Sequence, residues 1–577
     1  MGHGATRTLE RVAAAVGELV AAAPRFEPVR DVPQGGVLLA LPALLANGLL
    51  RHSETCFELP PGFYGVDSIF LLLGLMALAR IKSIEQLRYH PPGEWGKLLG
   101  LDRIPEVRTL RQKLQLLCAN GSPQPAAEGR LQQWSAKLAG EWLESDGQSD
   151  GLFYADGHVR VYHGALTRLP RRYVAREKLC LRGTTDYWVN VLGGQPFFLV
   201  PRAVDPGMIA VMRAQIVPQL EALVPLSSAR PETLNPAPRF TLVFDREGYS
   251  PEFFGEMKKR GIAILTYHKF PGDDWPLSEF TPRPVALANG EQSTMALAER
   301  RVELSGKVTV REVRKLTESG HQTSILSTNE RLDVPALASA MFARWSQENF
   351  FRYMREHYSL DRLVEYGTEE IPDATPVVNP RWREVDGHIR RETGKLTRQL
   401  ALFGAWELEG ELEEAKVKRY EERKGALHQD ITHRQAVIET LKATRKETPH
   451  HVTVADLPEA DRFQRLRGAC KYFVETIKMI AYRAETAMTC IVREKLARAD
   501  DARALLRDVY NTEVDLYPDL GAHTLTVRVH HLATQMQDNA ARHLCAEINA
   551  TETVFPGTEL RLVYELGSTQ NHRDQEV

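Results

Sequence analysis

The chain has 577 residues, and at about 100 to 200 residues per domain this length excludes a single small binding module. Hydrophobic residues make up 43% of the sequence and charged residues 26%, the mixture of an ordinary folded protein, which excludes wholesale disorder. Lysine and arginine total 73 against 75 aspartate and glutamate residues, a formal charge of −2. Any surface that binds nucleic acid must therefore be local.

Signals for membrane insertion, secretion and disulfide bonding are weak in this sequence. The longest apolar stretches, 36–50 and 69–79, fall short of the roughly 20 residues that span a bilayer. No uninterrupted apolar segment with a small-residue cleavage site marks the N-terminus. The six cysteines are scattered and form no Cys-x-x-Cys pair, which argues against a disulfide framework and a cysteine zinc site. We expect a protein of the reducing cytoplasm that has no membrane partner.

Residues 1–150 are expected to form a helical N-terminal region. Helical periodicity covers four segments, 8–22, 66–81, 83–89 and 93–118. In the last of these, a short helix, a Gly/Pro break and a second helix are typical of a helix-turn-helix that reads DNA. Such a motif would expose Arg108, Arg111 and Lys113. An ordinary helical hairpin with a solvated basic face explains the same pattern equally well.

From residue 151 the pattern changes to β-branched and aromatic runs separated by helical segments. Strands are expected at 152–162, 176–182, 197–200, 240–244 and 262–267, with helices at 207–223 and 251–260. Three antiparallel-looking strands followed by helix, strand, helix and strand are the element order of the ribonuclease H-like fold. The sequence therefore predicts an α/β protein in which 151–270 is the first part of a ribonuclease H-like catalytic core.

Five further regions follow the first part of the core. They are a β-rich insertion at 271–330, a helix that completes the core at 331–371, a charged helical arm at 381–446, a helical region at 456–515 and a small α/β region at 520–566. In the arm, Ile389, Leu396 and Phe403 recur at sevens, which is coiled-coil spacing. The arm is accordingly interpreted as a helical hairpin or a dimer arm, and the N- and C-terminal regions as mainly helical.

Two aspartates stand at unusual positions in the expected strands. Asp156 interrupts the apolar run 152–162, where a carboxylate is costly unless it is exposed or bound to something. Asp245 directly follows the apolar strand 240–244, and the carboxyl ends of strands are where open α/β sheets place their ligands. Taken singly, each aspartate is better explained as a turn former.

The helix expected near residues 334–358 carries a stripe of charge. Arg344, Glu348, Arg352 and Arg355 are spaced by four, four and three residues, so they share one helix face. A plain surface ion-pair ladder is one explanation of the stripe. Because aromatic and apolar residues dominate the rest of the helix, we expect the stripe to face a cleft.

With these motifs together, the sequence resembles the DDE transposases of bacterial insertion sequences, in the class with a Tyr-Arg-Glu-Lys signature on the catalytic helix. That signature has an arginine four residues before the glutamate and a basic residue seven after it. Arg344 and Arg355 occupy these positions relative to Glu348, whereas Met341 stands at the tyrosine position. The resemblance covers roughly residues 60–370.

The order Asp156, Asp245, β-rich insertion, Glu348 is also similar to this class, and the resemblance implies that these three residues are catalytic and bind metal. Three carboxylates about 4 Å apart repel by roughly 4 kcal/mol per pair at an effective dielectric constant of 20, and divalent cations remove this conflict. Two Mg²⁺ or Mn²⁺ ions could activate the attacking oxygen and stabilise the leaving one. The implied reaction is hydrolytic nicking at transposon ends, followed by attack of the freed 3′-hydroxyl on target DNA.

One segment is basic enough to hold DNA beside such a site. Residues 160–182 contain seven Lys/Arg and one acidic residue, and such cations bind backbone phosphates without reading sequence. A solvated basic hairpin is the alternative. The residues expected to contact DNA, besides those of the helix-turn-helix, are Arg171, Arg172, Arg176, Lys178, Lys269, Arg344, Arg352 and Arg355.

The expected partner is double-stranded DNA, as transposon ends and as target, in a bacterial cytoplasm where the protein acts on the chromosome. A homodimer in the DNA complex is one alternative. A structure-selective nuclease on the same core would cut strands without joining them. A domesticated, non-catalytic DNA-binding protein is a further alternative, although all three acidic positions are filled. A purely structural coiled-coil protein would explain the arm but not the aspartates at the strand ends.

Overall fold

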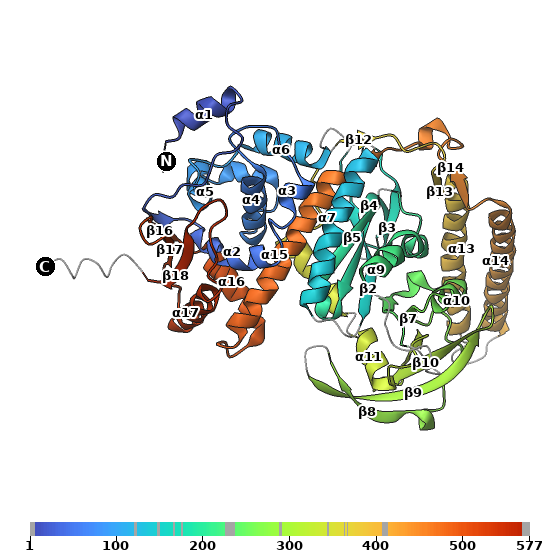
Figure 1. Ribbon diagram of the computed structural model, residues 1–577. Coiled ribbons are helices and arrows are strands. Elements are labelled where there is room, and N and C mark those ends of the chain that lie inside the picture. Colours follow the sequence, from blue (N-terminus) through green and yellow to red (C-terminus); the bar gives the residue numbers. More distant parts are fainter. Residues whose placement is uncertain are drawn as a thin grey trace. The chain divides into compact units, whose positions relative to one another are not determined.

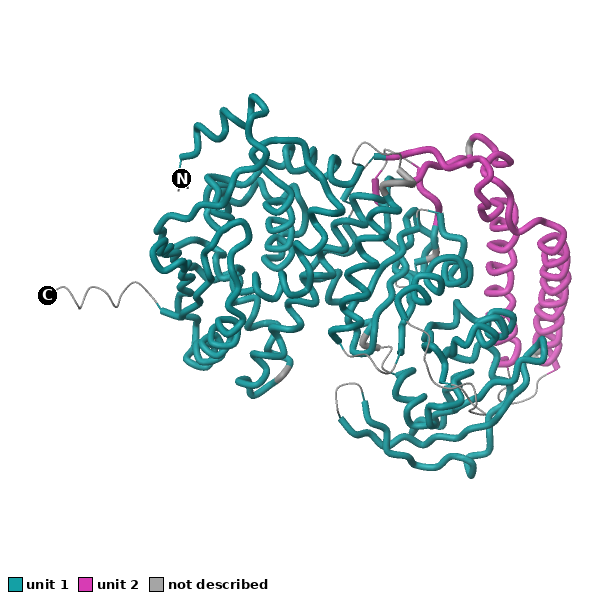
Figure 2. The backbone as a smooth tube through the Cα atoms, in the orientation of Figure 1, with its two compact units in different colours: residues 1–162, 172–367, 466–577 teal, residues 163–171, 368–465 magenta. Residues whose placement is uncertain are grey.

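The structure is a computed structural model, and its chain divides into two compact units. It describes residues 6–119, 124–146, 151–164, 168–174, 177–202, 204–224, 237–287, 291–342, 345–362, 364–365, 367–406 and 414–567. The first unit comprises residues 1–162, 172–367 and 466–577, and the second comprises 163–171 and 368–465 (Figure 2). Both α-helices and β-strands are abundant, so the protein is a mixed α/β protein, as the sequence predicts.

In the first unit, helices from both ends of the chain share one apolar core. The N-terminal helices are α1 (Thr8–Ala15), α2 (Leu41–Ala46), α3 (Ser53–Cys56), α4 (Val66–Leu78), α5 (Pro92–Leu98), α6 (Val107–Ala119) and α7 (Gln124–Ser145), with 3₁₀ segments η1 (Gly35–Ala40) and η2 (Ile84–Tyr89). The C-terminal helices are α15 (Ala469–Arg493), α16 (Ala502–Asn511) and α17 (Gln535–Asn549), with η8 (Ala499–Asp501). The long helix α15 packs against α4, α7 and α16, and in Figure 1 it runs beside α7 next to the large sheet.

A four-stranded sheet also joins the two ends of the chain. Its order is β1 (Val29–Val32), β16 (Val514–Asp519), β17 (Thr524–Val529) and β18 (Arg561–Leu566). Just after β1, the Gly36 N–H donates to Thr512 O at 3.0 Å. A Cβ atom on Gly36 would lie 1.9 Å from Val509 O, so this close approach requires glycine.

A ten-stranded sheet forms the other part of the first unit. Its order is β3 (Arg171–Val174), β4 (Leu179–Val191), β2 (Leu152–Val161), β6 (Thr241–Phe244), β7 (Ala263–Tyr267), β11 (Gln322–Ser327), β10 (Val308–Leu316), β9 (Gln292–Leu304) and β8 (Thr281–Ala286), with β5 (Pro196–Arg202) paired to β4. Strand β2 is antiparallel to β4 and parallel to β6, which is parallel to β7. The strands of the predicted insertion therefore continue the same sheet.

The two faces of this sheet are covered by different helices, because side chains alternate along each strand. On one face, Tyr154 and Val243 pack with α11 (Val334–Phe342), and the Tyr154 hydroxyl donates to Ala340 O at 2.9 Å. On the other face, Phe244 packs against Phe253 of α10 (Pro251–Lys259), with the ring centroids 6.2 Å apart. The remaining helical segments here are α8 (Met208–Val211), the π-helix η4 (Met212–Ile216), α9 (Val217–Leu223), η3 (Leu192–Gly194), η5 (Arg246–Gly248) and η6 (Leu277–Glu279).

The predicted helix near 334–358 is two helices, α11 and α12 (Trp345–His357), and residues 343–344 lie outside the described residues.

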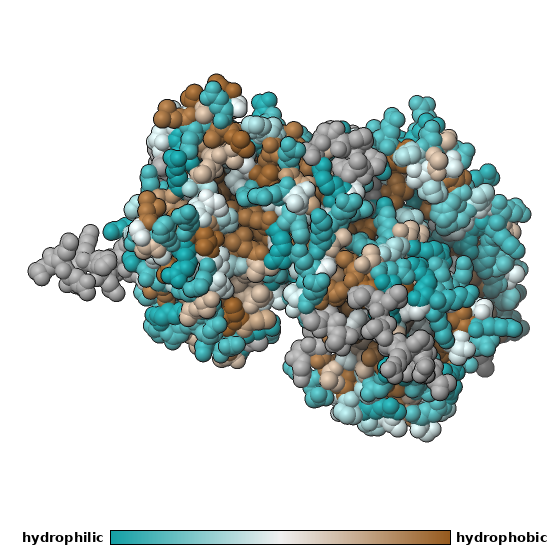
Figure 3. Space-filling view, in the orientation of Figure 1, coloured by the Kyte–Doolittle hydropathy of each residue, from teal (hydrophilic) through white to brown (hydrophobic). Residues whose placement is uncertain are grey.

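Within the described ranges no helix is both long enough and apolar enough to cross a bilayer. The first unit also exposes apolar side chains on and just after α1, namely Leu9, Val12, Val16 and Val20. Figure 3 shows a brown, hydrophobic area at the place of this helix. Helix α1 therefore leaves part of its apolar side outside the core.

The second unit is built around a helical hairpin of α13 (Pro380–Ala405) and α14 (Glu414–Glu447), one of the two interpretations of the charged arm. Ile389, Ile431 and Ile438 are buried. Arg445 pairs with Asp386 at 2.6 Å. The short elements of this part of the chain are β12 (Thr368–Glu369), β13 (Pro376–Val378), β14 (His451–Thr453), η7 (Glu459–Asp461) and β15 (Arg465–Leu466).

Candidate functional site

The two strand aspartates lie level with each other on neighbouring parallel strands. The pairing of β2 with β6 runs from Leu152–Thr241 to Tyr154–Val243. Continued by two residues, the same register places Asp156 beside Asp245, which directly follows β6. Neighbouring strands lie about 4.8 Å apart, and residues level with each other in a parallel sheet point to the same face. Asp156 and Asp245 therefore share the face that α11 covers further down the strands.

Main-chain groups orient both carboxylates. Asp156 Oδ1 accepts from the Gly157 N–H at 2.9 Å. Asp245 Oδ1 accepts from the Glu247 N–H at 2.8 Å and thereby caps η5. Turn formation, the simpler explanation of each aspartate, thus accounts for their local hydrogen bonds. It does not account for their side-by-side placement, which arises from the sheet.

Two further carboxylates, which the sequence analysis missed, surround this pair. Burial and the neighbouring carboxylates Asp245, Asp205 and Asp156 raise the pKa of Glu247 to about 7. Burial is the larger cause, and the charges of these three carboxylates add to it at Glu247. Glu247 follows Asp245 by two residues, a local signal that could have been noticed, whereas the position of Asp205 depends on the sheet.

Asp205 is held by donors from β4 and from its own turn. Its Oδ1 accepts from the Tyr187 hydroxyl and the Gly207 N–H, both at 2.8 Å, and its Oδ2 accepts from Thr185 Oγ1 at 3.2 Å. Burial, followed by the charges of Asp205 and Glu247, raises the pKa of Tyr187 well above its usual value. The acidic cluster thus comprises Asp156 of β2, Asp205 after β5, and Asp245 and Glu247 after β6. Tyr187 and Thr185 pair with Gly157 and Val159, so these two donors to Asp205 point to the sheet face opposite to Asp156.

One of the predicted DNA-contacting cations lies beside the acidic cluster. The positive charge of Arg172 lowers the pKa values of Glu247 and Tyr187, whereas the neighbouring carboxylates raise them. In contrast, Arg160, counted among the cations of the basic segment, is buried and pairs with Asp186 at 2.7 Å. This arginine is a structural member of the sheet and does not belong to an accessible basic surface.

Helix α12 packs on the face of β2 and β4 that carries Asp156. Gln347 is fully buried, and its Nε2 donates to Tyr154 O at 3.1 Å and to Asn190 Oδ1 at 2.9 Å. One turn later, Phe351 stacks on His158 of β2, with ring centroids 5.3 Å apart. Glu348 lies between these two anchors and is exposed. Glu348 therefore belongs to a helix that packs on the sheet face that carries Asp156.

The structure places two of the three predicted metal ligands, Asp156 and Asp245, level with each other on neighbouring strands. Among the residues that the structure describes, the ligand atoms of Asp156, Asp245 and Glu348 do not all lie within 4.8 Å of one another. The group that meets this distance is Asp31, Glu513 and His530, around the four-stranded sheet. The convergence of the triad stays a prediction.

The other predicted contacts on α12 and after β7 differ in exposure. Arg352 is exposed, whereas Arg355 is half-buried, and its Nε has no hydrogen-bond partner in the described part of the protein. Lys269 is exposed, with its Nζ 5.7 Å from the centre of the Phe270 ring. Arg344 lies outside the described residues.

On the basic segment, Arg171 and Lys178 are exposed, and Arg176 lies outside the described residues. Their roles in DNA binding stay predictions.

The predicted helix-turn-helix segment contains α5 and α6 joined by a short connection. Arg108 is exposed, and among the described residues it has no ion pair. Arg111 instead pairs with Glu85, and burial lowers the pKa of Lys113. An ordinary helical hairpin and a DNA-reading motif both fit this arrangement.

Comparison with known proteins supplies the family. No curated protein matches the chain. A family model described as "Transposase protein" matches residues 2–568. This match includes the sheet, α12 and the C-terminal helices, so it concerns nearly the whole chain. The chain therefore belongs to this transposase family, whose members are DNA-processing enzymes.

Proposed function

We propose that this transposase cuts DNA at transposon ends and joins the freed 3′ ends to target DNA, with Asp156, Asp245 and Glu348 as catalytic residues of a DDE site. The single observation that supports this proposal most strongly is the alignment of Asp156 with Asp245 on parallel strands beneath α12.

The strand order supports a ribonuclease H-like core. Strands β5, β4, β2, β6 and β7 lie side by side in this order. Strand β4 is antiparallel to both β5 and β2, while β2, β6 and β7 are parallel. Three antiparallel strands followed by two parallel ones are what the element order of that fold leads us to expect. The insertion β8–β11 then extends the β7 edge of the sheet.

The donor set fits a divalent metal. Oxygen ligands are those that Mg²⁺ and Mn²⁺ prefer, and here burial, followed by the charges of Asp245, Asp205 and Asp156, raises the pKa of Glu247 to about 7. A cation between Asp156 and Asp245 would remove this repulsion. When bound, two such ions would supply the Lewis acidity that activates an attacking oxygen and stabilises a leaving one.

The residues of the chain would bind and orient the reactants. Asp156 and Asp245, fixed by main-chain donors, would form the rigid side of the site, and the exposed Glu348 would complete it from α12. Rotation of the Glu348 side chain toward the strands would close the set of ligands. Arg172, beside the acidic cluster, would hold a phosphate of the DNA strand at the entrance.

Strand cleavage by single-residue variants tests the proposal. Asp156→Asn and Asp245→Asn keep the Oδ1 acceptor of each turn, so the fold should be retained while the metal ligand is lost. We expect Mg²⁺-dependent cleavage of DNA that carries the element ends to fall by more than about a hundredfold in each variant, with DNA affinity unchanged. The exposed Asp500→Asn variant is the matched control and should cleave normally.

The same assay separates the alternatives. Cleavage without strand joining by the unaltered protein would indicate a structure-selective nuclease, and DNA binding without cleavage would indicate a non-catalytic descendant. Full cleavage by Asp156→Asn would remove this residue from the site.

A further inference from the structure

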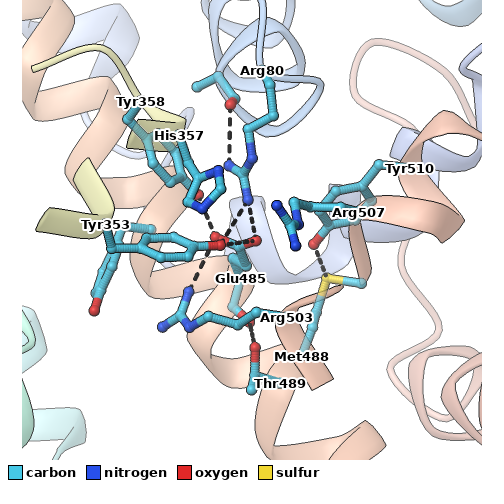
Figure 4. Close-up of polar contacts among 12 residues, drawn as sticks. Arg80, Tyr353, His357, Tyr358, Glu485, Met488, Thr489, Arg503, Arg507 and Tyr510 are labelled. Carbon is cyan, nitrogen blue, oxygen red and sulfur yellow. Dashed lines mark hydrogen bonds and ion pairs between the residues drawn. The ribbon is translucent and has the colours of Figure 1, made fainter. Parts of the chain in front are cut away.

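A fully buried carboxylate, Glu485 of α15, accepts hydrogen bonds from four side chains of three other segments of the first unit (Figure 4). Its Oε1 pairs with Arg80 and accepts from the Tyr353 hydroxyl at 3.0 Å. Its Oε2 accepts from the Tyr358 hydroxyl at 2.7 Å and from Arg503 Nη1 at 3.1 Å. Both carboxylate oxygens are therefore already used by neutral and charged donors.

The guanidinium groups around this carboxylate outnumber it. Arg80 and Arg503 both pair with Glu485, and Arg507 follows Arg503 by one turn of α16 and points toward the same place (Figure 4). In the described part of the chain Arg507 has no ion pair, and its buried Nε has no hydrogen-bond partner. Three arginines therefore share one buried carboxylate, and the exposed Glu356, whose Oε1 lies 3.7 Å from His357 Nε2, is a second acidic residue near this group.

His357 of α12 faces the same positive charges. Its ring packs 4.4 Å from the ring of Tyr353. Burial, followed by the charges of Arg80 and Arg507, lowers the pKa of His357. The charges of Glu356 and Glu485 act in the opposite direction. The imidazole can donate a hydrogen bond to a ligand, and both guanidinium groups lie close enough to act on it.

A half-buried arginine beside other arginines is unfavourable unless an anion accompanies it. Guanidinium groups match tetrahedral oxyanions because their planar forks donate two parallel hydrogen bonds to such groups. We propose that Arg507, Arg80 and His357 form an anion site that binds a phosphate group.

This site is separate from the proposed catalytic residues. His357 follows Glu348 by nine residues, which is two and a half helical turns, so the two side chains lie on opposite faces of α12. The proposal therefore does not depend on the DDE reaction. The phosphate group could belong to the DNA backbone or be free inorganic phosphate, and these two sources give different results in the experiment.

Thermal unfolding of the full chain tests the site itself. Melting temperatures of the unaltered protein, Arg507→Gln and the exposed control Arg542→Gln are compared in chloride and in phosphate at constant ionic strength. In chloride, Arg507→Gln should melt no lower than the unaltered protein, because a repelling charge is removed. Phosphate should raise the melting temperature of the unaltered protein and of Arg542→Gln by more than that of Arg507→Gln. General exclusion of phosphate from protein surfaces acts equally on all three.

DNA titration identifies the source of the phosphate group. If the group belongs to DNA, Arg507→Gln should bind duplex more weakly and show a log–log salt slope shallower by about one. Arg507→Lys, which keeps the charge without the fork, should bind between the two. If free phosphate is the ligand, the three proteins should bind DNA equally while the phosphate effect on melting persists. The proposal is overturned if Arg507→Gln responds to both phosphate and DNA as the unaltered protein does.

Discussion

Lys471 of α15 is a buried amine beneath the strands that carry the candidate site. Its Nζ donates to Leu360 O at 3.3 Å and pairs with Glu475. Burial, followed by the charge of Arg160, lowers the pKa of Lys471 to about 7. The charged groups that face it are Arg160 and Asp186 from β2 and β4, and Glu475 and Lys478 from its own helix.

The titration of Lys471 predicts a dependence of stability on pH. The usual pKa of lysine is 10.5, so between pH 7 and 10.5 the unfolded chain binds more protons than the folded one, and the free energy of unfolding should rise with pH. Lys471 should contribute a rise in the free energy of unfolding that approaches about 1.4 kcal/mol per pH unit. Lys471→Met should flatten this rise and leave Glu475 paired with Lys478 at 3.1 Å. Urea unfolding at pH 7, 8 and 9 measures the free energy of unfolding of both proteins. If this free energy rises with pH equally in the variant and the unaltered protein, the titrating group is not Lys471.

Local sequence signals identified some residues of the acidic cluster. Asp156 and Asp245 could be selected because each breaks or ends an apolar strand. Asp205 could not be selected from the sequence, because hydrogen bonds from Tyr187 and Thr185 of β4 determine its position. Glu247 follows Asp245 by two residues, but its raised pKa also depends on burial and on Asp205 and Asp156, which only the fold brings near.

Among the elements, α12 connects packing to the candidate site. Gln347 is the buried anchor that ties this helix to β2 and β4. Gln347→Leu should leave the Tyr154 carbonyl and the Asn190 amide oxygen without this donor, at a cost of about 1–3 kcal/mol in stability. Because Glu348 is the next residue, cleavage should fall more than DNA affinity.

Chemical denaturation and the cleavage assay, run on the same preparations, check the role of Gln347. The exposed Gln132→Leu variant of α7 is the control and should change neither quantity. A Gln347→Leu protein that is as stable and as active as the unaltered one would show that this anchor does not position Glu348.

Element types were predictable where periodicity is local and strong. The apolar runs at 240–244 and 262–267 are β6 and β7, and the helix expected at 251–260 is α10. Strands β1 and β16 were missed, because Arg30 and Asp31 make one of them polar and Pro518 interrupts the other. Their pairing joins residues from opposite ends of the chain, which no local pattern reveals.

For the whole molecule, the sequence indicated a helical front and a helical rear as separate regions. The structure places residues 1–162 and 466–577 in one unit, with α15 packed against α4 and β1 paired with β16. Periodicity shows that a helix has an apolar face but does not show which partner covers it. The order of strands and helices between residues 241 and 267 was easier to anticipate, because these elements alternate in sequence.

In the proposed mechanism, Asp156, Asp245 and Glu348 together bind the catalytic metal ions. Anomalous scattering from crystals of the full chain soaked in Mn²⁺ tests it most directly. We expect manganese peaks between Asp156 and Asp245, with a second ion about 3.5–4 Å away toward Glu348, and we expect neither in Asp156→Asn crystals. Manganese bound at Asp31, Glu513 and His530, with none at Asp156 and Asp245, would contradict the claim.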